Sequence, residues 1–225
     1  MHPGRRPTWR LCAIVVVFAG AGAARAAETP KPTVLFDGKT LAGWTPTDFS
    51  HAGEVVVKDG AIVLGTGRAM TGITTTRQDL PKTDYELVYE AQRVKGSDFF
   101  AAATFPVGKS FLSFVNGGWG GTVTGLSSLG GADASENETG RFYEYKNNTW
   151  YRFRVRVTDK VVRCWINDEV VVDVGHEDRM KSTRLEMHFS QPMGFATWES
   201  TGVIRKVEVR KLTPEEVAAT KPPED

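Results

Sequence analysis

Apolar and polar residues alternate at every second position over several short stretches of this 225-residue chain. The pattern is clearest over 84–94, which reads DYELVYEAQRV. One face of that stretch carries Tyr85, Leu87, Tyr89 and Ala91, and the other carries Glu86, Val88, Glu90 and Gln92. Successive side chains of a β-strand point to opposite faces, so the alternation predicts a strand in a sheet with one packed and one polar side.

Turn signals separate similar stretches along the rest of the chain. Asp-Gly at 59–60 and Asn-Asp at 167–168 each lie between two apolar runs, which is typical of β-hairpins. Further strands are predicted at 72–77, 99–105, 150–157, 184–190 and 203–212. About ten to twelve short strands without a long helix predict an all-β fold, a two-sheet sandwich of the jelly-roll type. We expect one such domain over 34–212.

The two ends of the chain carry different signals. Residues 1–26 combine early arginines, an apolar run and an A-x-A cleavage site, which predicts a signal peptide and export to the periplasm or beyond the cell. We expect 27–33 to be a flexible lead-in and 213–225 to form a short helix with a frayed tail. Removal of the signal peptide leaves Cys164 as the sole cysteine, so no internal disulfide is expected. The same cleavage removes the apolar run, which is too short for a retained membrane span, so no membrane insertion is expected.

Charge and ligand patterns exclude several kinds of partner. Lys and Arg together number 28 and Asp and Glu 27, without a basic stripe, so nucleic acid is not an expected partner. No spacing of His, Cys and carboxylate residues predicts a metal site or another cofactor. Calcium held by loop aspartates such as Asp133 is chemically feasible, because oxygen ligands can come from any part of a loop.

The middle of the chain, 116–148, has many glycines and small polar residues and little periodicity. Long connections inside compact domains are usually functional or disordered, and the aromatic and leucine residues within this one argue against disorder. Two interpretations stay open: an ordered binding or lid segment, and a structural excursion that contains short strands.

Several stretches taken together resemble a known family. In chain order they read VLFDGKTLAGW, VKDGAIVLGTG, TDYELVYEAQRV, WYRFRVRV with CWINDEVVVD, and MGFATWESTGVIRKVEVRKL. As an ordered set they resemble the 3-keto-disaccharide hydrolase domain. The resemblance implies a concanavalin A-like jelly roll with a concave sugar-binding face, and cleavage of glycosides already oxidised at C3. SDFFAAATFP stands where many members carry Asn-Ser-Gly and a strand arginine, which indicates a divergent branch.

The acidic pair Glu86 and Glu90 is one candidate for glycoside chemistry. Residues four apart on a strand have Cα atoms about 13 Å apart, whereas the carboxyls of a retaining glycosidase lie roughly 5–5.5 Å apart. The alternative is that both glutamates form surface ion pairs with arginines on another strand, and the candidates are Arg152, Arg154 and Arg156.

A 3-keto-glycoside makes a smaller demand on the protein. The ketone acidifies the C2 proton, so one base and one cation suffice for elimination of the C1 substituent, and water then adds back. Arg184, Glu186 and His188 share one face of the strand predicted at 184–190. We therefore expect Glu90, Glu186 and His188 to be catalytic, the alternative being a solvated ladder of charges.

Tryptophans and charged side chains are the candidates for binding a carbohydrate partner, because an indole stacks on a pyranose and charged edges bind hydroxyls. The expected substrate-binding residues are Glu86, Trp119, Arg154, Arg184 and Trp198. A non-catalytic carbohydrate-binding module would use the same tryptophans without a base. An inert structural domain would have a filled concave face.

Overall fold

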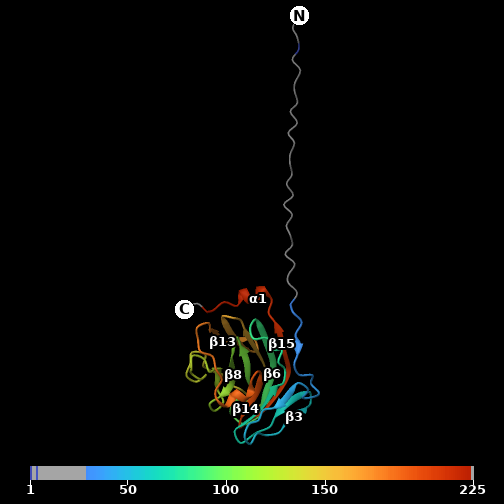
Figure 1. The fold of residues 1–225 in the computed structure, drawn as a ribbon, viewed down its shortest axis with the longest axis vertical. Coiled ribbons are helices and arrows are strands. Elements are labelled where there is room, and N and C mark those ends of the chain that lie inside the picture. The colour runs from blue at the N-terminus through green and yellow to red at the C-terminus, as the bar shows by residue number, and fades with distance from the viewer. Residues whose placement is uncertain (2–3, 5–28, 224–225) are drawn as a thin grey trace.

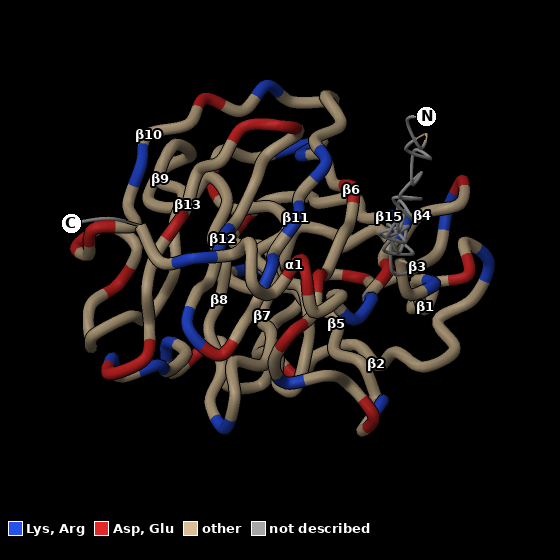
Figure 2. The backbone as a smooth tube through the Cα atoms, turned by 90° about the horizontal axis from the view of Figure 1, so that it is seen from above, with Lys and Arg blue, Asp and Glu red and all other residues tan. Residues whose placement is uncertain are grey.

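The computed structural model describes Met1, Gly4 and residues 29–223, which form two antiparallel sheets packed face to face (Figure 1). Apart from those two residues, the expected signal peptide lies outside the described part of the chain. The predicted all-β, two-sheet jelly-roll sandwich is confirmed. Seen from above, acidic and basic positions are interspersed over the molecule (Figure 2), in line with its balanced composition.

The first sheet has the order β13-β12-β11-β6-β15-β4-β3, and β1 pairs with β15. Its strands are β1 (Thr33–Val34), β3 (Val55–Lys58), β4 (Ala61–Leu64), β6 (Tyr85–Lys95), β11 (Tyr151–Val157), β12 (Val161–Ile166), β13 (Glu169–Gly175) and β15 (Thr201–Lys211). The two hairpins expected from turn signals, β3–β4 and β12–β13, are both present.

The second sheet has the order β10-β9-β8-β7-β14-β5-β2. Its strands are β2 (Trp44–Pro46), β5 (Met70–Thr75), β7 (Ala102–Val107), β8 (Ser110–Gly118), β9 (Val123–Ser127), β10 (Arg141–Phe142) and β14 (Gly194–Trp198). The middle segment 116–148 therefore contains short strands. It is an ordered excursion that adds β9 and β10 to this sheet.

Strand β6 holds the centre of the first sheet, between β11 and β15. Its apolar face is fully buried between the sheets, as the alternation predicts. Tyr89 stacks on Phe153 with ring centroids 5.0 Å apart and meets Phe195 of the second sheet edge-on at 4.8 Å. Its polar face, with Glu86 and Glu90, points away from the core.

The helix α1 (Pro214–Ala219) follows β15 at one end of the sandwich (Figure 1). Thr213 is its N-cap, and the side chains of Thr213 and Glu216 satisfy each other's backbone amides in a capping box. Glu216 also accepts hydrogen bonds from Arg210 of β15 at 2.7 and 2.8 Å, which ties the helix to the first sheet.

The strand predicted at 184–190 is wrong. The chain there forms a 3₁₀ helix, η1 (Glu186–Ser190), with i→i+3 bonds such as Met187 N to Arg184 O at 3.1 Å. Within η1 only Met187 and Ser190 are buried. The alternation there does not mark a strand: in the described part of the chain, residues 184–190 belong to neither sheet, and η1 packs on β5 and β14. The predicted end of a strand before Pro106 is also wrong, since β7 continues to Val107.

Small residues make up much of that outer face. Gly72, Ala196 and Ala102 pair across β5, β14 and β7, and Gly194 and Thr104 lie in the next row. Short side chains leave room above the strands. The segment with η1 occupies part of this room, and the remainder is a pocket.

Candidate functional site

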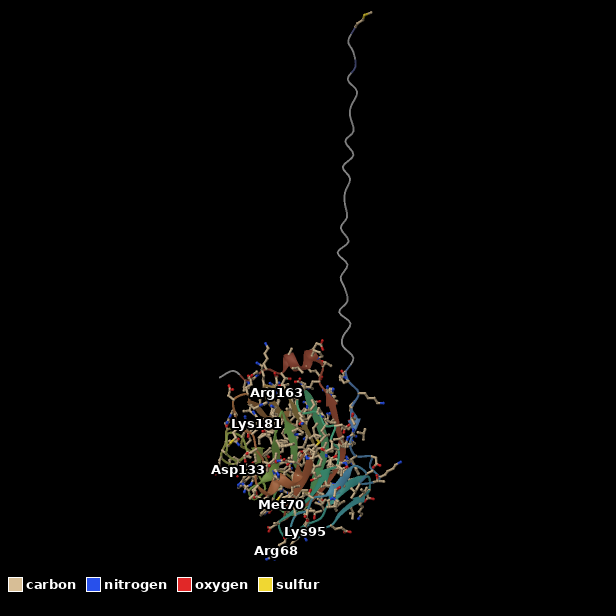
Figure 3. The ribbon with its side chains drawn as sticks, viewed as in Figure 1. Arg68, Met70, Lys95, Asp133, Arg163 and Lys181 are labelled. Atoms are coloured by element: carbon tan, nitrogen blue, oxygen red, sulfur yellow. The ribbon has the colours of Figure 1, made fainter. Side chains whose placement is uncertain are left out.

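A pocket of about 200 Å³ lies on the outer face of the second sheet. Its lining residues are Met70, Asp98, Phe99, Ala102, Val115, Trp119, Ser127, Arg184, Glu186, Met187 and Trp198. The pocket lies toward the end of the sandwich that is remote from α1, as the positions of Met70 and Arg163 show (Figure 1 and Figure 3). Sheet strands form the floor, the β8–β9 turn forms one wall, and the segment that leads into η1 forms another.

The β8–β9 turn holds Trp119 at the pocket. Trp119 has a positive φ of 50°, and its glycine neighbours Gly117 and Gly120 have left-handed backbones too, which glycine adopts readily. The Asp98 carboxylate accepts the Gly120 amide at 2.8 Å and the Phe99 amide at 2.7 Å, so it fixes the turn against the β6–β7 connection. Trp119 is 43% exposed, and it is therefore available to a ligand.

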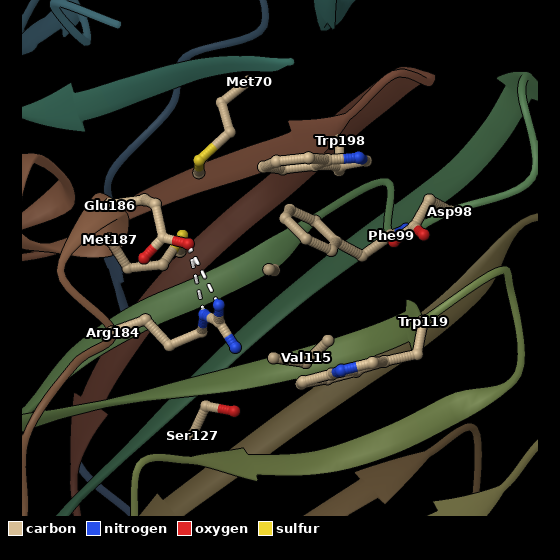
Figure 4. A pocket seen from close by; sticks show the side chains of 11 residues that line it. Met70, Asp98, Phe99, Val115, Trp119, Ser127, Arg184, Glu186, Met187 and Trp198 are labelled. Carbon is tan, nitrogen blue, oxygen red and sulfur yellow. Dashed lines mark hydrogen bonds and ion pairs between the residues drawn. The ribbon is translucent and has the colours of Figure 1, made fainter. Parts of the chain in front are cut away.

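A second indole faces Trp119 from the other side of the pocket. Figure 4 shows Trp198 and Trp119 on opposite sides, with Phe99 between them at one end and Arg184 at the other. The rings of Trp198 and Phe99 are 6.4 Å apart, and both pack on the apolar floor of the pocket. This arrangement suits a flat ligand with apolar faces and polar edges, which is how a pyranose presents itself to aromatic side chains.

Arg184 and Glu186 form the charged end of the pocket. Arg184 donates to Glu186 Oε1 from Nη2 at 3.1 Å and from Nε at 3.4 Å (Figure 4). Its remaining nitrogen, Nη1, contacts Asp133, whose other oxygen accepts the Ser128 hydroxyl at 2.8 Å. The guanidinium lies 5.8 Å from the centre of the Trp119 ring. Arg184 is thus held by two carboxylates and aimed at the pocket.

These contacts set the protonation of the pair. Burial raises the pKa of Glu186, but hydrogen bonds from its own amide and from Arg184 outweigh burial, so the pKa lies below its ordinary value. Burial lowers the pKa of Arg184, and its bonds to Glu186 and Asp133 more than offset this, so the pKa is raised. At neutral pH the pocket therefore holds a carboxylate beside a guanidinium.

Four of the expected site residues lie in this pocket, namely Trp119, Arg184, Glu186 and Trp198. Glu86, Glu90 and Arg154 do not, because β6 and β11 belong to the other sheet and turn these side chains to its outer face. The expected grouping of Glu90 with Glu186 and His188 is wrong for that reason.

Glu86 and Glu90 have ion-pair partners on their own sheet. Glu86 is bound by Arg156 at 2.8 Å and Arg210 at 2.9 Å, with Arg154 at 4.0 Å. Glu90 is bound by Arg205 at 2.7 Å and by Lys206 at 2.8 Å. The alternative prediction was that these glutamates pair with arginines of the strand that became β11. It describes Glu86, which contacts Arg154 and Arg156, but the partners of Glu90 lie on β15 instead.

His188 is also separate from Glu186, although it is only two residues away. A 3₁₀ helix has three residues per turn, so positions i and i+2 do not share a face. His188 is exposed, and its Nδ1 lies 3.2 Å from the side-chain Nε2 of Gln191. It is not a lining residue of the pocket.

Asp98, Phe99 and Met187 also line the pocket, and no pattern in the sequence singles them out. One usable signal was the stretch 99–105, which is apolar or small on both faces. Such a strand needs cover on its outer face, and the segment that covers it brings Arg184 and Glu186.

The described residues include no group of three or more His, Cys, Asp or Glu side chains placed to hold a metal ion. Asp133, the example given for calcium, is occupied by Arg184 and Ser128 instead. Within the same part of the chain, no helix has the length and apolar character needed to span a membrane.

Solved structures share this fold at low sequence identity. Domain 4 of AbnA, an extracellular arabinanase of Geobacillus stearothermophilus solved with arabinotriose, aligns with a TM-score of 0.54 and 16% identity, over 86% of this chain and 99% of that one. The Crh5 transglycosylase, solved with NAG, aligns with a TM-score of 0.53 and 13% identity, over 83% and 89%. The fold is therefore that of the concanavalin A-like sandwiches.

The profile of the 3-keto-alpha-glucoside-1,2-lyase-like domain matches residues 31–210, most of the chain. The protein belongs to this family, and the resemblance found in the sequence is confirmed. Its function is carbohydrate-related. A search of the curated proteins gave no significant match.

Proposed function

We propose that the pocket binds the oxidised ring of a 3-keto-glycoside and cleaves its C1 substituent by elimination. The observation that carries this proposal is the Arg184–Glu186 pair, a carboxylate and a guanidinium 3.1 Å apart at one end of an aromatic pocket. Elimination from a 3-keto sugar needs one base and one cation, and the pair supplies one of each.

In the proposed reaction the ring lies between Trp119 and Trp198. Glu186 takes the C2 proton, and the C–H electron pair becomes an enolate whose charge rests on the C3 oxygen beside Arg184. The enolate then collapses: the C3 carbonyl re-forms, the electron pair of C2=C3 forms C1=C2, and the C1–O bond breaks with its electron pair on the leaving oxygen. The leaving oxygen takes the proton from Glu186, and addition of water across C1=C2 completes a hydrolysis.

Arg184 has two opposing effects on this chemistry. It keeps Glu186 ionised at neutral pH but also makes it a weaker base, since its hydrogen bonds hold the pKa down. A substrate oxygen that draws the guanidinium away from Glu186 would strengthen the base at the moment of reaction. Asp133 holds Arg184 from its other side, which limits how far it moves.

A panel of 3-keto-glycosides and their unoxidised parents tests the proposal. We expect cleavage of the keto substrates only, with Glu186→Gln reducing turnover by about 100-fold or more, the usual scale of a general base. Glu136→Gln is the matched control, because Glu136 is an exposed loop residue away from the pocket lining. Equal turnover by Glu186→Gln and the wild type would refute the assignment of the base.

The second candidate is a non-catalytic carbohydrate-binding domain, favoured by the facing indoles and by the firm pairing of Glu186 with Arg184. It predicts saturable binding of a glycan without turnover, with binding weakened in Trp119→Ala. We further propose that the protein is exported, on the strength of residues 1–26. The N-terminal residue of the protein recovered from cells tests this, and the expected start is Ala27.

A further inference from the structure

An apolar strip continues from the pocket along the outer face of the second sheet. Met70, Met187, Ala102 and Ala196 form a buried cluster there, with Phe49, Phe99 and Trp198 packed against it. Phe99 and Trp198 line the pocket, whereas Phe49 lies beyond it. Phe49 covers Gly72 of β5 so closely that a Cβ atom at Gly72 would lie 2.7 Å from its ring.

The strip ends in an aromatic pair, of which Phe189 is exposed and Phe49 is half-buried. Phe189 meets Phe49 edge-to-face, with ring centroids 6.3 Å apart and planes at 85°. Phe189 is 59% exposed, although its backbone is anchored by a 3.1 Å bond from the Thr74 hydroxyl to its carbonyl. A fixed, exposed phenyl ring beside a pocket presents contact area that the fold itself does not use.

The proposed reaction, on which this inference rests, sets the direction of the substrate. C3 lies beside Arg184 and C2 beside Glu186. C1 is the other neighbour of C2, so it lies past Glu186 on the side away from Arg184. Figure 4 shows Met70 on that side, and Phe49 packs against the cluster that contains Met70. The C1 substituent therefore points along the strip toward Phe49 and Phe189.

We propose that this strip is the binding site for the leaving group, and that it selects an aromatic or apolar aglycone over a second sugar. Thioether and phenyl carbons contact an aryl ring favourably, but they offer no partners for the hydroxyls of a sugar. The strip would bind a sugar aglycone less well than an aromatic one, because sugar hydroxyls buried against such a surface lose their hydrogen bonds to water.

Substrate preference is the direct test. We would measure kcat/KM for phenyl and methyl 3-keto-glucosides of both anomers, and for a 3-keto-disaccharide, with the wild type, Phe49→Leu, Phe189→Ala and Phe142→Ala. Phe142 is the matched control, an exposed phenylalanine on β10. We expect the wild type to prefer phenyl over methyl, and the ratio to fall by about 3- to 10-fold in Phe189→Ala, the scale of one aromatic contact. Phe142→Ala should keep the wild-type ratio.

Binding of the unoxidised phenyl and methyl glucosides, followed by tryptophan fluorescence, separates this inference from the proposed reaction. Failure to turn over any keto substrate would refute the reaction, and the binding ratio would still test the strip. Tighter binding of the phenyl glucoside, weakened in Phe189→Ala, supports the strip. Equal binding of both glucosides, an unchanged ratio in Phe189→Ala, or a preference for the disaccharide overturns it.

Discussion

Glu86→Gln should destabilise the protein strongly while leaving the pocket on the second sheet intact. The Glu86 side chain is 5% exposed and receives Arg156 at 2.8 Å and Arg210 at 2.9 Å, whose side chains are 15% and 14% exposed. Removing one partner of a buried ion pair costs about 3–5 kcal/mol, because the remaining charge stays buried without compensation. Glu216 still neutralises Arg210 from 2.7 Å, so we expect the lower end, about 3 kcal/mol.

Thermal unfolding followed by circular dichroism measures this loss. One kcal/mol shifts the Tm of a domain of this size by about 2–4 °C, so Glu86→Gln should lower it by about 6–12 °C. Glu90→Gln is the matched control on the same strand. Its side chain is 19% exposed and its partner Lys206 63%, so we expect a loss of about 1 kcal/mol or less. Equal losses in the two variants, or a Tm for Glu86→Gln within about 2 °C of the wild type, would refute the reasoning.

Further predictions concern the pocket and the C-terminal helix. Arg184→Met removes the guanidinium bonds that lower the pKa of Glu186 and leaves burial opposed only by the bond from its own amide, so the pKa should rise and the acidic limb of the kcat/KM profile should move to higher pH. An unmoved limb would mean that another group titrates. Trp119→Ala should weaken sugar binding by about 5- to 10-fold, measured by calorimetry, since it removes one stacking face. Arg210 lowers the pKa of Glu216 from 4.5 to about 2, so this contribution to stability is present above about pH 4.5 and is lost as pH falls toward 2. In urea unfolding, Glu216→Gln should cost about 1–2 kcal/mol at pH 6 after solvent screening, and markedly less at pH 2.5; an equal cost at both pH values would contradict this.

Alternation along the strands was sufficient to predict the fold class. In β6 the residues Tyr85, Leu87 and Tyr89 are fully buried, as their spacing requires. The same spacing correctly places Glu86 and Glu90 on the polar side of that strand. It cannot tell which of two outer faces in a sandwich carries the pocket, because both sheets have an inner and an outer side.

The charged pair in the pocket was found for a reason that proved wrong. Arg184, Glu186 and His188 were grouped by strand periodicity, and η1 has a different period. Arg184 and Glu186 meet because the chain turns after Arg184, and His188 is turned away by the same geometry. A pattern of alternate apolar residues cannot distinguish these cases without knowledge of whether a neighbouring strand is present to bond the backbone.

The placement of Trp119 and Trp198 in the pocket has a clearer basis in the sequence. Trp119 lies among glycines that permit a left-handed turn, and such a turn projects its side chain from the sheet. Asp98 could not be predicted, because its role depends on the Gly120 amide, which is distant in sequence and is brought close by the β7–β8 and β8–β9 hairpins. The floor of small residues is formed in the same way, by the register of β5, β14 and β7.

Arg184 and Glu186 both lie on the connection between β13 and β14, and neither lies on a strand. The ladders of both sheets are complete without that connection. A descendant with a shorter connection would therefore keep its sandwich, its register and both indoles, and would lose Arg184 and Glu186 together. A single deletion there would remove the proposed base and cation together and leave the proposed sugar-stacking indoles in place.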